Sequence, residues 1–175
     1  MIKVSIVILN WNSDNYLKDC LKAICAQSFK DFEVIFVDNG SSNGSLEEVK
    51  KAYPTFIYVE NNLNYGFARG MNIGISHAQG EYVLLLNTDV YLDSNYLEEC
   101  VKALDCDSTL GCVAGVEYPW KNGKLLQSTY SSGALGIKLH LQLGDMGIVD
   151  GYTFGVSGSF PIYRRSEEHT SELQS

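Results

Sequence analysis

The sequence has few basic residues. Its 175 residues include 13 Lys and Arg against 21 Asp and Glu, so the formal net charge at pH 7 is −8. Domains that bind nucleic acids normally carry a basic face or stripe, which this composition disfavours. We therefore expect no nucleic-acid partner. An anionic ligand would be held locally, by a metal ion, backbone amides or a single Arg side chain.

Cysteine pairs and long apolar runs are also lacking. The five Cys residues include no CxxC pair, so neither a disulfide framework nor a zinc site is indicated, and a reducing, cytoplasmic location fits best. No apolar run approaches the roughly 20 residues of a membrane span, and segment 1–9 is too short for a signal peptide. We expect no transmembrane segment in this chain, while peripheral association with a membrane stays open.

Apolar segments and helical patterns alternate along the chain. Strands are predicted at 4–9, 32–37, 55–59, 82–86 and 111–116. A first helix is predicted after a cap at Asn12 or Ser13, with a core stripe that starts at Tyr16. Further helices are predicted after a capping box at 45–48, over 66–78, and after the cap at 93–95. This alternation predicts one α/β domain with a mainly parallel sheet. Segment 133–154 lacks a clear period, so we expect irregular structure there that shapes an acceptor pocket.

Polar residues follow three of the expected strands. The segments are Asn10-Trp11-Asn12, Asp38-Asn39 and Asn87-Thr88-Asp89. Ligands of open α/β sheets bind beyond the carboxyl ends of strands, so convergence of these ends would suit a nucleoside diphosphate. Asp89 has no Cys or His neighbours, and a carboxylate in this setting suits Mg²⁺ or Mn²⁺. The alternative for Asp89 is a structural role in a turn.

Glycine recurs every four residues at Gly66, Gly70 and Gly74, on one face of a predicted helix. The absence of Cβ atoms favours close packing of this face on the sheet. Arg69 of the same helix could offer its guanidinium to a phosphate or be a solvated surface residue, and both interpretations stay open. Neither GxGxxG nor GxxxxGK[ST] follows an expected strand, which disfavours dehydrogenases and P-loop enzymes.

Four segments, 4–12, 37–45, 64–74 and 80–89, resemble in order and spacing the donor half of the family-two inverting glycosyltransferases. The resemblance implies a GT-A fold with a Rossmann-like, mainly parallel sheet flanked by helices, a nucleoside-diphosphate sugar donor and a divalent metal, Mg or Mn. It places Asn87-Thr88-Asp89 at the DxD position, with Asp89 as the metal ligand and Asn87 where many relatives carry Asp. The donor-binding residues that it implies are Asn10, Asn12, Asp38 (at the nucleoside), Asn39, Arg69, Asn72, Asn87 and Thr88.

The resemblance is good over 1–118, the donor half, and looser over 119–164, a partial acceptor half. The family's general base lies in a Glu-Asp motif beyond a Gly-Gly-Phe-Asp-Glu-like segment, and this chain has neither, so its catalytic base is unknown and expected to be absent. Segment 165–175 resembles a translated sequencing-library adapter. We therefore expect a C-terminally truncated chain with little or no transfer activity.

The expected function of the full-length protein is transfer of a sugar from a nucleoside-diphosphate donor to a glycan, a lipid-linked acceptor or another cell-surface acceptor, with inversion. Two alternatives remain at this point. One is a nucleotidyltransferase, although the Asn10-Trp11-Asn12 turn lacks the Gly- and Arg-rich loop expected of that class. The other is a non-catalytic nucleotide-binding module.

Overall fold

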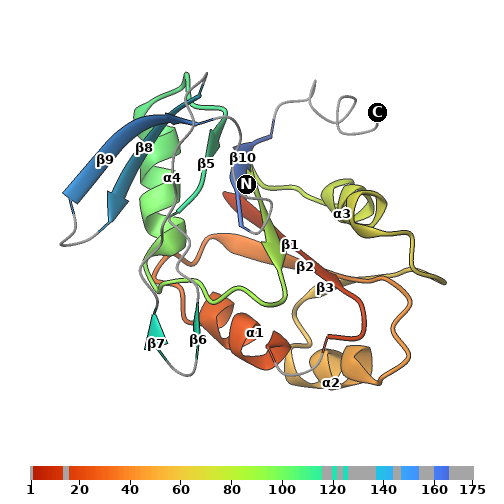
Figure 1. The fold of residues 1–175 in the computed structure, drawn as a ribbon. Helices are drawn as coiled ribbons and strands as arrows, with labels where there is room; N and C mark the ends of the chain where they lie inside the picture. The colour runs from red at the N-terminus through yellow and green to blue at the C-terminus, as the bar shows by residue number, and fades with distance from the viewer. Residues whose placement is uncertain are drawn as a thin grey trace.

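A six-stranded sheet, in the order β3-β2-β1-β4-β10-β5, forms the centre of the computed structural model (Figure 1). The structure describes residues 2–13, 16–115 and 160–165, and the backbone of strands at 120–121, 124–125, 137–143 and 147–153. The sheet strands are β1 (Val4–Asn10), β2 (Phe32–Asp38), β3 (Ile57–Glu60), β4 (Tyr82–Asn87), β5 (Cys112–Val113) and β10 (Ile162–Arg164). The strands β3, β2, β1 and β4 are parallel, whereas β10 is antiparallel to β4 and β5. The predicted mainly parallel α/β sheet is confirmed.

Helices cover both faces of this sheet. They are α1 (Leu17–Cys25), α2 (Ser45–Ala52), α3 (Phe67–Ile75) and α4 (Tyr96–Cys106). Ile6 and Ile8 of β1 belong to the core shared with α1, α2 and α4, whereas Val7 packs on the other face with Met71 of α3. Successive side chains of a strand point to opposite faces, so a strand that is apolar at nearly every position forms the middle of three layers. None of the described helices is long and apolar enough to cross a membrane.

Helix α1 begins later than its sequence predicts. The expected cap at Asn12 or Ser13 is wrong, because the helix begins only after Tyr16. Tyr16, expected in the core stripe, is 69% exposed. The Asn12 side chain accepts a hydrogen bond from the Ser42 backbone, and the Ser13 hydroxyl lies against that of Thr88. Asn12 and Ser13 therefore bond to distant loops and do not cap α1. Short polar side chains can bond to any backbone or hydroxyl group that the fold places nearby.

The capping box predicted at 45–48 is also wrong. Ser45 is itself the first residue of α2, and the N-cap is Gly44, with a φ of 79° that favours glycine. The Ser45 hydroxyl accepts a hydrogen bond of 2.9 Å from the amide of Asn10. The side chain expected to cap α2 therefore joins the helix to the end of β1.

Two glycines let α3 lie close to the sheet. A Cβ atom at Gly70 would lie 2.6 Å from Cδ1 of Leu9, and one at Gly74 would lie 2.7 Å from Cγ2 of Val37. Both distances are far shorter than a normal carbon–carbon contact, so the predicted packing role is confirmed for these two residues. Gly66 differs, because it precedes the helix at a φ of 81° with open space around it.

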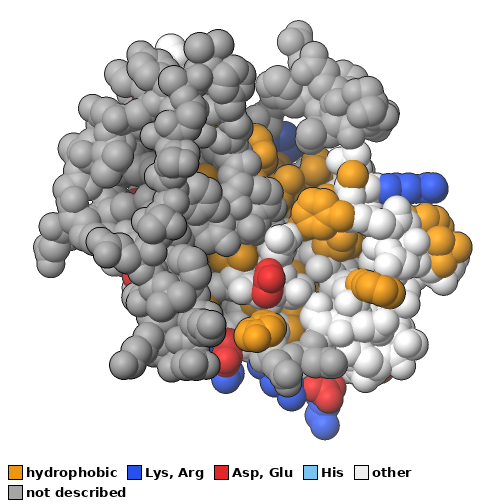
Figure 2. All heavy atoms as spheres, in the orientation of Figure 1, with side chains coloured by type: hydrophobic (Ala, Val, Ile, Leu, Met, Phe, Trp, Pro, Cys, Tyr) orange, Lys and Arg blue, Asp and Glu red, His pale blue; other side chains and the backbone are white. Residues whose placement is uncertain are grey.

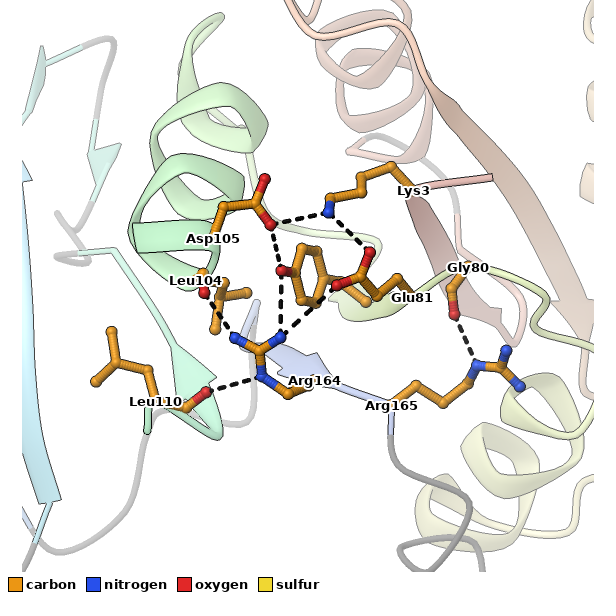
Figure 3. A network of polar contacts seen from close by, with 9 residues as sticks. Lys3, Gly80, Glu81, Leu104, Asp105, Leu110, Arg164 and Arg165 are labelled. Atoms are coloured by element: carbon orange, nitrogen blue, oxygen red, sulfur yellow. Dashed lines mark hydrogen bonds and ion pairs between the residues drawn. The ribbon is translucent and has the colours of Figure 1, made fainter. Parts of the chain in front are cut away.

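A polar network closes the amino-terminal edge of the sheet (Figure 3). Arg164, at the end of β10, donates a hydrogen bond of 2.6 Å to the carbonyl oxygen of Leu104 in α4. Lys3 forms ion pairs with Glu81 and Asp105 at 2.7 and 2.8 Å. These contacts hold the antiparallel strand β10 between β4 and β5. The polar strand ends lie at the opposite, carboxyl edge of the sheet.

Hydrogen bonds continue from β10 into Arg165. Its backbone N–H donates to the carbonyl oxygen of Glu81 at 2.9 Å, and its Nε donates to that of Gly80 at 2.7 Å. Arg165 is the first residue of the expected non-native tail, 165–175, and the rest of this tail lies outside the described residues. The limits proposed for the donor half, the acceptor half and the tail stay predictions.

The irregular structure expected for 133–154 is wrong in part. Strands β8 (Ile137–Leu143) and β9 (Gly147–Thr153) pair antiparallel, and β6 (Trp120–Lys121) pairs with β7 (Lys124–Leu125). The sequence of β8 alternates apolar and polar residues, which is typical of a strand with one covered face. This alternation indicated a strand, but it is short and lies in a segment with many glycines, so the strand was not predicted. An acceptor pocket formed by side chains of this segment lies outside the described residues.

Candidate donor site

The three polar strand ends meet at the carboxyl edge of the sheet. The register pairs Asn10 with Asp38 between β1 and β2, and Leu9 with Asn87 between β1 and β4. The ends of β2, β1 and β4 are therefore neighbours in that order. This confirms the predicted convergence of the strand ends, while the binding role of each residue stays a prediction.

A cleft of about 360 Å³ opens at this edge. This volume falls in the range of small-molecule sites. Trp11 and Phe67, which line this cleft, are 55% and 53% exposed. Figure 2 shows hydrophobic side chains scattered over the coloured surface, with the basic side chains at its periphery. The cleft is lined by Leu9, Trp11, Ser13, Asn39, Asn64, Gly66, Phe67, Asn87, Thr88 and Asp89.

Asp89 presents a carboxylate that is free of partners within the described part of the chain. Its side chain is exposed, and no described residue donates a hydrogen bond to it or forms an ion pair with it. Its charge nevertheless acts on the interior: burial, and then the charge of Asp89, raise the pKa of the Cys20 thiol to about 12. A carboxylate held at the cleft without a protein cation is suited to an external one.

Asp38, in contrast, is buried and bonded on both oxygens. Its Oδ1 accepts a hydrogen bond of 2.8 Å from the Asn10 amide, and its Oδ2 accepts one of 2.9 Å from the Ser41 backbone. Asn10, fully buried, also donates to the hydroxyl groups of Ser41 and Ser45. The pair therefore organises the loop after β2. Contact of Asp38 with a nucleoside stays a prediction.

Asn39 holds the segment that enters α3. Its Nδ2 donates to Oδ1 of Asn64 at 2.9 Å and to the carbonyl oxygen of Gly66 at 3.2 Å, and its Oδ1 accepts from Asn61 and from the Tyr65 backbone. One buried amide thus uses donors and acceptor together to fix the cleft wall.

Arg69 and Asn72, both implied by the resemblance, stand apart from this cleft. The Arg69 side chain is exposed, and its guanidinium lies 4.2 Å from the centroid of the Tyr65 ring. Asn72 is half-buried in α3, and neither residue is among those that line the cleft. Their donor-binding roles stay predictions.

The cleft is also lined by five residues that were not expected in the site from the sequence: Leu9, Ser13, Asn64, Gly66 and Phe67. Ser13 and Asn64 adjoin or begin the polar segments that resemble the family, so their position carried a usable signal. Phe67 lies four residues before Met71, a spacing that places both on one face of a helix. Met71 is buried as expected, but Phe67 lies at the first turn of α3, where the helix projects into the cleft.

The residues present fit a metal ion that is shared with a ligand. Among the described residues, no group of three or more His, Cys, Asp or Glu side chains could hold a metal alone. The cleft offers one carboxylate, from Asp89, and the side-chain oxygen atoms of Asn87 and Thr88. Mg²⁺ and Mn²⁺ keep several waters and need only one or two carboxylates when phosphate oxygens complete the coordination. The donor set suits a metal held jointly with a diphosphate.

Sequence comparison decides the family. A sequence model of the family described as "Glycosyl transferase family 2" matches residues 5–168. The chain belongs to this family. The chondroitin synthase of Pasteurella multocida is 34% identical over 112 residues, which cover 63% of this chain and 12% of that protein. The chain therefore spans only a small part of the length of this family-2 relative.

Two solved structures share the fold of this chain. The mannosyltransferase PcManGT of Pyrobaculum calidifontis, solved in complex with GDP-Man and Mn²⁺, has a TM-score of 0.61 at 27% identity and covers 66% of this chain and 35% of its own. TarS 1-349 of S. aureus in complex with UDP-GlcNAc has a TM-score of 0.67 at 22% identity, covering 98% and 46%. The expected GT-A fold is confirmed.

Proposed function

We propose that this chain forms the donor-binding part of an enzyme that transfers a sugar from a nucleoside-diphosphate donor to a glycan, a lipid-linked acceptor or another cell-surface acceptor, with inversion. The observation that carries this proposal is the free Asp89 carboxylate in a cleft where three parallel strand ends converge. Ligands of such sheets bind at this edge, and a carboxylate there can hold the metal of a diphosphate.

The described residues at this edge would have different roles in donor binding. Asp89, with Thr88 beside it, would hold a divalent ion against the diphosphate, and the ion would stabilise negative charge on the leaving group. Trp11 offers an exposed aromatic face for a base or sugar ring. The hydrogen bonds of Asn39 keep Asn64 and Gly66 in place as the wall of the cleft, so a ligand meets a preformed surface.

Known relatives support this proposal. PcManGT, at 27% identity, was solved with GDP-Man and Mn²⁺, a nucleotide sugar and a divalent metal of the expected kind. The names of other relatives, such as the poly(ribitol-phosphate) beta-glucosyltransferase of Bacillus spizizenii, describe sugar transfer to polymeric acceptors. The five cysteines are all unpaired, which is expected in a reducing compartment, and we place the enzyme in the cytoplasm.

A non-catalytic nucleotide-binding module is the second candidate. An inverting transfer needs a general base near the acceptor hydroxyl. Among the described residues that line the cleft, Asp89 is the only carboxylate, and its use for a metal leaves no second acid there. Donor binding without efficient transfer would follow for this chain.

Titration calorimetry with UDP and with GDP, each with and without Mn²⁺, tests the donor site. We expect one of these nucleotides to bind more tightly with Mn²⁺, and Asp89→Ala to remove this metal dependence. Asp31→Ala is the control, because the exposed Asp31 side chain makes no described hydrogen bond. Equal metal dependence in Asp89→Ala would reassign Asp89 to a turn role. Release of UDP or GDP from the matching nucleotide sugar, with an acceptor glycan present, separates the enzyme from the module.

A further inference from the structure

The loop after β4 is held by two side chains from the segment after β1. Ser13 Oγ lies 2.9 Å from Thr88 Oγ1, and the Cys20 thiol of α1 donates to the carbonyl oxygen of Asn87 at 3.6 Å. The partners are 75 and 67 residues apart in sequence. The two residues before Asp89 are therefore restrained through a hydroxyl group and a backbone carbonyl.

Asp89 itself is not restrained in this way by any residue of the described part of the chain. No described residue bonds to its exposed carboxylate, so its direction depends on the backbone of Asn87 and Thr88. Thr88 is β-branched, and a partner at its hydroxyl selects one of its few side-chain rotamers. A ligand held in place before the metal arrives loses less conformational freedom when it binds.

Ser13 can act in this way because its own turn is anchored. Asn12 has a φ of 49°, a left-handed conformation that non-glycine residues rarely adopt. Its backbone N–H donates to Ser41 Oγ at 2.9 Å, and its Oδ1 accepts from the Ser42 backbone at 2.8 Å. These bonds over-determine the turn and compensate for its strain. The Ser13 hydroxyl therefore projects from a fixed backbone to the loop that carries Asp89.

We propose that Ser13 is a positioning residue for the divalent metal of the donor site, acting through Thr88 on the direction of Asp89. This inference rests on the proposed function, because it takes the metal and the diphosphate from it. It adds a residue from the turn between β1 and α1 to those that determine metal affinity. Partners that orient a metal ligand affect metal affinity without touching the ion.

The test measures Mn²⁺ affinity separately from nucleoside affinity. Free Mn²⁺ is followed by electron paramagnetic resonance while Mn²⁺ is titrated alone, with UDP and with GDP, and uridine or guanosine binding is measured without metal. We expect Ser13→Ala to weaken Mn²⁺ binding roughly 3- to 10-fold, the effect of one lost hydrogen bond, and to leave nucleoside binding unchanged. Ser13→Thr keeps the hydroxyl and should restore Mn²⁺ affinity.

Ser42→Ala is the matched control. The Ser42 hydroxyl bonds to no described residue, and the substitution keeps the backbone N–H that donates to Asn12. It should leave Mn²⁺ affinity unchanged. Wild-type affinity for Mn²⁺ in Ser13→Ala would overturn this inference but not the proposed function. Equal losses of metal and nucleoside binding would also overturn it, because they indicate a general structural role. If the wild-type protein binds no Mn²⁺ under any of these conditions, both the proposed function and this inference fail.

Discussion

Asn10 and Asp38 are paired in register at the carboxyl ends of β1 and β2, and the Asn10 amide donates a hydrogen bond of 2.8 Å to the Asp38 carboxylate. Both side chains are buried, with Asp38 only 3% exposed. A buried carboxylate is costly unless hydrogen bonds offset the loss of water, and here Asn10 and the Ser41 backbone supply them. The two acids of the site therefore differ in kind: Asp38 maintains the loop, and Asp89 faces the cleft.

Asp38→Ala should strongly destabilise the protein. It removes the charged acceptor of the Ser41 N–H and of one of the three Asn10 hydrogen bonds, and hydrogen bonds to charged groups contribute about 1.5–3 kcal/mol each. We expect the free energy of unfolding, measured by urea denaturation, to fall by about 2–4 kcal/mol. Asp89→Ala is the control and should change it by no more than about 0.5 kcal/mol. Similar values for the two variants would contradict the distinction between these acids.

Gly74→Ala should destabilise the packing of α3. The new Cβ would meet the side chains of Val7 and Val37, which are fully buried and β-branched and so cannot easily move aside. Overpacking costs about 1–3 kcal/mol, while the better helix propensity of Ala offsets about 1 kcal/mol. Thermal and urea unfolding should show a net loss. Gly111→Ala adds the same methyl group where no atom of the described residues lies within 4 Å, and should be close to neutral. No loss in Gly74→Ala would mean that α3 can shift on the sheet.

Asp105 should make stability depend on pH in the acid range. Hydrogen bonds from Lys3 and then from Tyr82 lower the pKa of Asp105 below its ordinary value. A carboxyl group with a lowered native pKa stabilises the fold above its unfolded pKa, about 3.9, and this contribution is lost as the pH falls through the native pKa. Its side chain is 46% exposed, so solvent screening limits the contribution to below about 1 kcal/mol.

The measurement compares Asp105→Asn with the wild-type protein by urea unfolding between pH 3 and pH 7. We expect the variant to be less stable near pH 7 and the difference to shrink below about pH 4. Asp31→Asn serves as the control, since the exposed Asp31 side chain makes no described hydrogen bond. A difference for Asp105→Asn that stays constant across this range would contradict the role of its charge.

The sequence alone determined the class of fold and the edge of the sheet that carries the site. The apolar run that becomes β4 has no polar alternation, which is typical of a strand covered on both faces. Parallel strands share one carboxyl edge, so the polar residues after β1, β2 and β4 had to meet once the strands were adjacent. This reasoning needs only the local pattern and the common direction of the strands.

Only the tertiary structure decided what each polar side chain does. Asn12, Ser13 and Ser45 have the residue types of helix caps, but their partners come from other loops. Asp38, the last residue of β2, is buried among donors, whereas Asp89, two residues after β4, is exposed. Hydrogen-bond partners as far as 75 residues away, as for Ser13 and Thr88, leave no trace in local spacing. The type of each side chain was encoded locally, whereas its partner depended on which loops the sheet brought together.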